Sequence, residues 1–195
     1  MIDQKRIAEA EKNVKRYLDD DWLLTKRKDM VQHCGFFMKN AETSLITANT
    51  LFEISNEPAK KKILMLSATF ESYLWVVVSA YYSMFYAALA LLAKHEIKVG
   101  GKVHQVVSDT LVANFLKNQK LAKLLDAYED AKDEALQLVG TEERAEELIA
   151  NYERERQKRN DLQYELGCEA KQNLAKTSLE RATKFVAEVR NILRL

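Results

Sequence analysis

Arg159 is the residue of this sequence whose type and position best suit the binding of an anion. It belongs to residues spaced three and four apart, as on one helix face: Leu148, Tyr152, Glu155, Arg159, Leu162 and Leu166. An arginine on such an apolar face costs free energy unless it is paired or binds an anion, and its planar guanidinium fits a phosphate. The alternative is structural, because Glu155 lies one turn before Arg159 and can form an ion pair with it.

The polar residues that follow Arg159 are Asn160, Asp161 and Tyr164. Tyrosine has an unperturbed pKa of about 10, so Tyr164 can donate a hydrogen bond to a phosphate but is a poor general base. A spacing of five residues turns by about 140° around a regular helix. Arg159 and Tyr164 therefore share one site only if the helix kinks or a second subunit closes the site.

Four further residues with basic or imidazole side chains are candidates for substrate binding: Arg156, Lys158, Lys102 and His104. Lys102 follows two glycines at the start of an expected helix, where an anion can approach the backbone. Two alternatives stay open. Acidic residues interrupt the basic run around Arg159, which is typical of a solvated helix face, and His104 can be purely structural.

The sequence predicts neither a metal site nor a cofactor. It contains no E-x-x-H, which argues against a di-iron bundle. It also contains no H-E-x-x-H and no glycine-rich nucleotide-binding motif. Cys34 and Cys168 are far apart and lack metal-ligand spacing, so we expect reduced thiols and no disulfide.

The elements that position these side chains are predicted to be helices. The 195-residue chain contains 5 glycines and 1 proline, too few for the turns of a β-rich fold. Apolar spacing predicts helices over residues 2–19, 28–55, 59–96, 103–118, 121–139, 141–166 and 169–195. The net charge of +1 gives no overall attraction to nucleic acid. The charged N-terminal residues do not resemble a signal peptide, so a cytoplasmic location is expected.

Residues 72–93 form a run of 22 residues without a charge. Such a run is either a membrane span or a helix buried on all sides. Four aromatic residues crowd its middle, Tyr81, Tyr82, Phe85 and Tyr86, whereas tyrosines in membrane spans prefer the two interfaces. The sequence therefore favours the central helix of a bundle, and no membrane partner is expected.

Three segments resemble HEPN-domain proteins. The stretch S-A-Y-Y-S-M-F-Y-A-A-L-A-L-L-A at 79–93 is similar to the family's first long helix, which typically reads A-Y-Y-A-M-F-H-A-A-R-A-L-L. The stretch K-V-H-Q-V-V-S-D-T-L at 102–111 resembles the segment that opens the next helix. R-N-D-L-Q-Y at 159–164 matches the spacing of R-x-x-A-D-Y, which several small members carry in place of an Arg-to-His motif.

The resemblance covers residues 37–195 and implies an up-and-down helical bundle with a four- or five-helix core. Residues 1–36 would be an N-terminal extension of one or two helices. Members usually form two-fold homodimers, in which the Arg and His of both subunits cleave RNA without a metal. Many are toxins with a nucleotidyltransferase antitoxin as partner.

By this match the resemblance implies that Arg159, Asn160, Asp161 and Tyr164 are the candidate catalytic residues. Because Tyr164 stands at the position of the motif histidine, the resemblance leaves two functions open. One is a metal-independent endoribonuclease. The other is an inactive module that binds nucleotide, RNA or a protein partner as a dimer.

Overall fold

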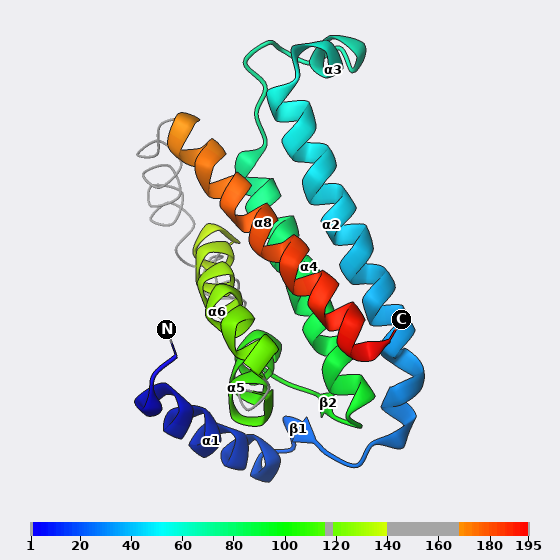
Figure 1. The fold of residues 1–195 in the computed structure, drawn as a ribbon, viewed down its shortest axis with the longest axis vertical. Coiled ribbons are helices and arrows are strands. Elements are labelled where there is room, and N and C mark those ends of the chain that lie inside the picture. The colour runs from blue at the N-terminus through cyan, green and yellow to red at the C-terminus, as the bar shows by residue number, and fades with distance from the viewer. Residues whose placement is uncertain (1, 116–118, 140–167, 195) are drawn as a thin grey trace, which may run out of the picture.

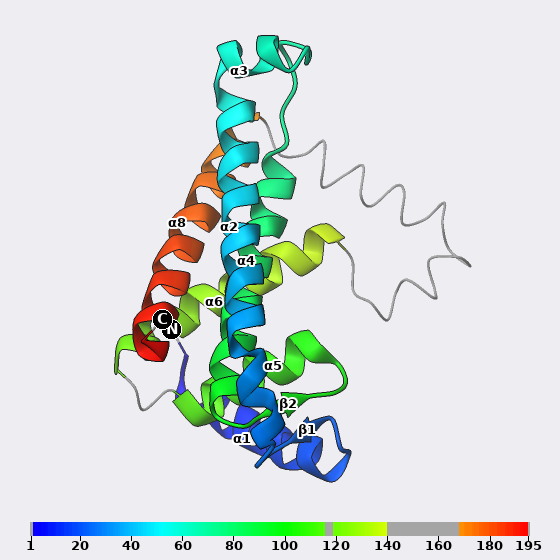
Figure 2. The same cartoon turned by 90° about the vertical axis from the view of Figure 1, so that its right-hand side faces the viewer.

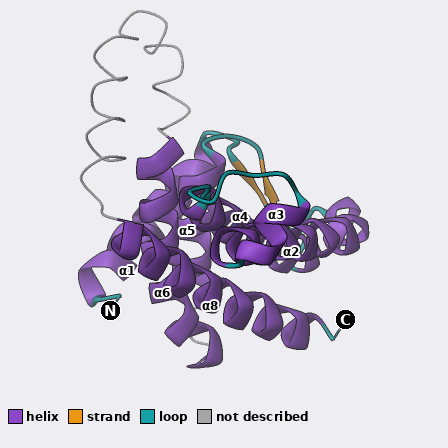
Figure 3. Ribbon diagram, turned by 90° about the horizontal axis from the view of Figure 1, so that it is seen from above, coloured by secondary structure: helices purple, strands orange, loops and turns teal. Residues whose placement is uncertain are grey.

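The computed structural model describes residues 2–115, 119–139 and 168–194, which form an all-α bundle (Figure 1). The all-α prediction is confirmed. The helices are α1 Gln4–Asp19, a 3-10 helix Lys28–His33, α2 Cys34–Asn56, α3 Pro58–Ile63, α4 Tyr73–Lys94, α5 Val103–Phe115, α6 Gln119–Val139 and α8 Cys168–Leu193. Strand structure in the described ranges is limited to β1 Leu23–Leu24 and β2 Lys98–Val99 (Figure 3, orange).

Helix α4 is the centre of the bundle and corresponds to the uncharged run of the sequence. It packs against α2, α8, α6 and α5, and α2, α4 and α8 run side by side along the long axis of the molecule (Figures 1 and 2). Its length and composition would also suit a membrane span, but 78% of its most apolar 18-residue window is buried inside the protein. In this structure the run is therefore a core helix.

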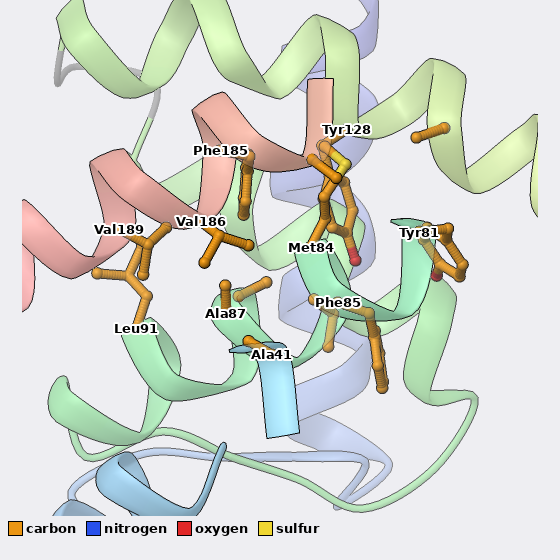
Figure 4. Close-up of a cluster of buried hydrophobic side chains, with 14 of the residues drawn as sticks. Ala41, Tyr81, Met84, Phe85, Ala87, Leu91, Tyr128, Phe185, Val186 and Val189 are labelled. Carbon is orange, nitrogen blue, oxygen red and sulfur yellow. The ribbon is translucent and has the colours of Figure 1, made fainter. Parts of the chain in front are cut away.

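Small residues let the neighbouring helices approach α4 closely. Five alanines of α4 are fully buried: Ala80, Ala87, Ala88, Ala90 and Ala93. Ala41 and Ala48 of α2 are also fully buried. Figure 4 shows Val189 of α8 beside Leu91 of α4, within a cluster that joins the three helices. Two large side chains, Tyr128 of α6 and Phe185 of α8, belong to the same buried cluster.

The single helix predicted over residues 59–96 is wrong, because the structure divides it into α3 and α4. Met65 has a left-handed φ of 55°, which ends α3. The Ser55 hydroxyl accepts a hydrogen bond from the Ser72 backbone N–H at 2.9 Å, which ties the start of α4 to the end of α2. The helical spacing of apolar residues continues through this break, so the spacing alone predicted one continuous helix.

The other predictions for the described residues agree with the structure to within a few residues, with two exceptions. The helix predicted over 28–55 begins as the 3-10 helix and becomes α-helical only at Cys34. Part of the loop predicted at 98–102 pairs with β1 as the antiparallel strand β2. The helix predicted over 141–166 lies outside the described residues.

The N-terminal residues share the core of the bundle. Helix α1 packs on α5, and Tyr17 and Leu23 belong to the same buried cluster as α4. The turn that follows β2 is tight, because a β-carbon at Gly101 would lie 3.1 Å from the Trp22 ring. The boundary predicted between residues 36 and 37 falls within α2, and the division into two units stays a prediction.

Truncation of Leu91 to alanine tests the packing around α4. Leu91 is fully buried, so Leu91→Ala should lower the free energy of unfolding by about 3 kcal/mol through lost burial and a residual cavity. Ile46→Ala is the matched control, because Ile46 of α2 is 65% exposed. Its expected change in the free energy of unfolding is below about 0.5 kcal/mol. Urea unfolding followed by circular dichroism measures both, and equal losses would contradict this assignment of the core.

Candidate functional site

The candidate residues identified from the sequence fall into two groups. The catalytic candidates Arg159, Asn160, Asp161 and Tyr164, and the basic residues Arg156 and Lys158, lie outside the described residues. Lys102 and His104 are described and lie at the start of α5. The Lys102 ammonium lies 5.1 Å from the centre of the Trp22 ring, at cation–π distance.

His104 is held between rings of α4. Its Nδ1 lies 2.7 Å from the Tyr81 hydroxyl. The Phe85 ring centre lies 4.6 Å from the imidazole centre, and the Tyr82 ring stands edge-on at 5.9 Å. Two segments that the sequence singled out separately, the aromatic run and the start of α5, are therefore in direct contact.

The Tyr81 hydroxyl fixes the hydrogen-bonding role of His104. Burial raises the pKa of Tyr81 well above its usual value, so the phenol keeps its proton. Nδ1 is the acceptor within hydrogen-bond distance, and we assign the Tyr81 O–H as the donor to it. The neutral imidazole then carries its proton on Nε2. In this form Nδ1, the ring nitrogen that could abstract a proton, is occupied by the Tyr81 hydroxyl, so the ring is not arranged for proton abstraction.

Behind this pair lies Tyr128 of α6, whose ring centre is 6.1 Å from that of Tyr81. Its hydroxyl is buried and forms no regular hydrogen bond among the described residues. Burial, followed by the electrostatic influence of the nearby Tyr81 hydroxyl, raises the pKa of Tyr128 well above its usual value. The Tyr81 and Tyr128 hydroxyls therefore lie near each other without a regular hydrogen bond between them. Because the pKa of each phenol is raised, both stay protonated at neutral pH.

A polar network begins one turn after His104. The Ser108 hydroxyl of α5 donates a short hydrogen bond to Glu129 of α6, and Arg6 of α1 lies 3.1 Å from the same carboxylate. Burial acts to raise the pKa of Glu129, but Lys132, Ser108 and Arg6 together lower it below the usual value. Glu129 is therefore a fixed negative charge between three helices.

Asp109 is the most deeply buried charge of this network, with its side chain 3% exposed. Arg6 Nη1 donates to its Oδ1 at 2.6 Å. The Tyr17 hydroxyl and the Asn13 amide donate to Oδ2 at 2.7 and 3.0 Å. Both carboxylate oxygens are therefore paired, which offsets the cost of burying the charge. The network fixes α1 against α5 and so supports the helix that carries His104.

An aromatic groove runs between α2 and α4 on the other side of Tyr82. Its volume is about 330 Å³, and it is lined by Thr43, Ser44, Thr47, Trp75, Val78, Ser79, Tyr82 and Tyr86. Trp75 is 64% exposed. Ring faces with hydroxyl groups between them suit the stacking of a planar base with polar edges. Tyr82 contacts both this groove and the His104 ring.

Sequence reasoning missed the aromatic groove and the network around Asp109. Trp75, Ser79, Tyr82 and Tyr86 recur in steps of four, three and four, and the serine among large rings was a signal for a face that is not fully buried. Asp109 is a lone acid in the apolar stretch V-V-S-D-T-L-V, which indicated a paired buried charge. Among the described residues, no group of three or more His, Cys, Asp or Glu side chains could hold a metal ion.

No protein-family model, curated protein or solved structure matches this chain. Its function is therefore inferred from its own residues and their contacts.

Replacement of Arg6 tests the network around Asp109. Arg6→Ala should lower the free energy of unfolding by about 3 kcal/mol, because it leaves a buried carboxylate without its cation. Lys15→Ala on the exposed face of α1 is the control and should change little. The double variant Arg6→Ala/Asp109→Ala should recover part of the loss in urea unfolding. A single-variant loss no larger than that of the control would contradict a structural role for the pair.

The raised pKa of the buried Tyr17 predicts a loss of stability at high pH. Burial and the hydrogen bond to Asp109 raise the pKa of Tyr17 to about 12, against about 10 in an unfolded chain. The unfolded chain thus releases this proton first, so the stabilisation is complete below pH 10 and is lost as the pH rises to about 12. Urea unfolding between pH 8 and 12 should show this fall, and Tyr17→Phe should make it shallower. Parallel curves for the two proteins would refute the assignment.

Proposed function

We propose that this chain is a HEPN-like RNA-acting protein that binds single-stranded RNA. The contact between the two described segments that carry the resemblance supports this proposal. Tyr81, in the Y-Y-S-M-F-Y stretch, hydrogen-bonds His104, in the K-V-H stretch, at 2.7 Å. These segments are 23 residues apart in the sequence, and their pairing places an oriented imidazole beside the aromatic groove.

The proposed RNA site divides the recognition of bases from that of phosphates. The aromatic groove stacks a base on Trp75, Tyr82 or Tyr86, and this contact is tolerant of sequence because every base has a ring face. His104 Nε2–H and Lys102 donate to phosphate or base oxygens. Arg159, with Arg156 and Lys158, supplies further phosphate contacts, for which a guanidinium is well suited. This arrangement favours binding, since the assigned imidazole tautomer is a donor.

A second candidate function is metal-independent cleavage, as the toxin of a pair with a nucleotidyltransferase antitoxin. The spacing from Arg159 to Tyr164 favours it, because it matches the variant motif of small HEPN proteins. Cleavage needs a group that removes the ribose 2′ proton and another that protonates the leaving 5′ oxygen. Tyr164 serves better as the second, so a homodimer in which the partner supplies a base fits this candidate. We propose a cytoplasmic location for either function.

One set of variants tests binding and cleavage together. Fluorescence anisotropy with a labelled single-stranded RNA should show binding that His104→Gln and Arg159→Ala each weaken by about tenfold, the effect of losing a charge-assisted hydrogen bond. His33→Gln and Arg16→Ala remove the same side-chain types elsewhere and should bind as the wild type does. Binding that is absent, or equal in all five proteins, would contradict the proposal.

The same samples are incubated with the RNA in excess chelator and run on a denaturing gel. Intact RNA is expected for a binding module. Chelator-resistant cleavage that Arg159→Ala abolishes would instead establish the endoribonuclease. Light scattering of the purified chain tests the proposed homodimer.

A further inference from the structure

The connection between α2 and α4 carries three consecutive exposed apolar side chains. Ile63 is 78% exposed, Leu64 50% and Met65 95%. These residues, here called the apolar tip, lie at the end of α3, at one end of the bundle and beyond the end of α2 (Figures 1 and 2). Most exposed apolar residues of a soluble domain are scattered singly, so three in succession at a projecting end indicate a contact surface.

The backbone of the apolar tip is already paired, which lets the turn leave water at low cost. Three internal hydrogen bonds close it: Leu64 N–H to Lys60 C=O at 3.0 Å, Met65 N–H to Lys62 C=O at 3.1 Å and Leu66 N–H to Lys61 C=O at 2.9 Å. A segment that enters a lipid environment must satisfy its amides internally, because no water is present to do so. The turn satisfies this condition at the residues that carry the exposed side chains.

Met65 occupies a backbone position that favours glycine. Its φ of 55° lies in the left-handed region, where a helix C-terminus usually has glycine. Its side chain is almost fully exposed, so the folded protein gains little packing from it. A methionine here contributes nothing visible to folding, and its apolar side chain is available to a surface outside the protein.

Lysines accompany the apolar tip. Lys60 is paired within α2 and α3, at 2.6 Å from Glu53 and 3.0 Å from Glu57. Lys61 donates to the Ala68 carbonyl at 3.2 Å. No carboxylate among the described residues lies within ion-pair distance of Lys61 or Lys62, so both charges can meet an external anion.

We propose that the apolar tip inserts into the surface of an anionic lipid bilayer, with Lys61 and Lys62 at the lipid phosphates. Amphipathic segments with basic residues bind membranes in this way without spanning them. A protein partner fits less well, because a stable protein interface needs about 800 Å² on each side and three side chains at a convex end offer less. This contact is separate from the RNA site and leaves α4 in the core of the bundle. It revises the expectation, drawn from the sequence, that the protein has no membrane partner.

Sedimentation of the full chain with vesicles tests the proposal. The protein should pellet with phosphatidylcholine vesicles that contain phosphatidylserine, more than with phosphatidylcholine alone, and salt should weaken the binding. Met65→Gly should weaken it by about tenfold and leave Tm unchanged or higher, because glycine suits the left-handed backbone. Lys62→Gln should weaken it by about fivefold. Ile46→Ser and Lys184→Gln, at exposed positions elsewhere on the bundle, are the matched controls.

Four results would overturn the proposal. One is the absence of vesicle binding, and another is equal binding to neutral and anionic vesicles. The third is full binding by Met65→Gly, since a purely electrostatic attraction to any polyanion would survive this change. Concentration-dependent self-association that Met65→Gly abolishes, without vesicle binding, would assign the apolar tip to a protein contact and would also overturn it.

Discussion

The structure depends on the burial of one helix that is apolar on every side. Residues 73–93 of α4 carry no charge, so exposure of this helix to water would cost free energy in proportion to its apolar area. The chain meets this constraint by surrounding it with α2, α8, α6 and α5. The buried alanines set the spacing of these neighbours, and the neighbours in turn determine where side chains at the edge of α4, such as Tyr81 and Tyr82, meet other elements.

The charged groups buried beside this core, Asp109 and Glu129, are paired, and their pairing fixes the relative positions of three helices. The carboxylate of Asp109 receives donors from Arg6, Asn13 and Tyr17 of α1, so α5 has one orientation in which its charge is satisfied. That orientation also turns His104 toward Tyr81. The stability of the buried network and the geometry of the candidate site are therefore linked through a single short helix.

Much of the fold could be predicted from the sequence, because absence of charge and helical spacing are local signals. Residues 72–93 were predicted to be the central helix on these grounds. The break before α4 could not be predicted, since Met65 adopts a glycine-like backbone without the glycine that would mark it.

The candidate site was harder to predict from the sequence. The pair of Arg6 and Asp109 joins residues 103 positions apart, and no local pattern specifies such a contact. The same holds for Tyr81 and His104, whose types were noted but whose contact depends on how α5 packs on α4. Arg159 was identified from its residue type, its spacing and the resemblance to HEPN-domain proteins, and its role stays a prediction.

The ion pairs that join Arg6 of α1 to Asp109 and Glu129 affect the order in which the chain folds during synthesis. The ribosome releases α1 before α5 and α6, since the partners of Arg6 lie 103 and 123 residues further along the chain. Contacts of such long range form late, after the loop between them has closed. Helix α1 suits this delay, because its buried residues are limited to Ala10 and Tyr17 and most of its surface is polar. It can stay hydrated beside the growing chain, and the buried carboxylate of α5 becomes fully paired only when this first helix docks.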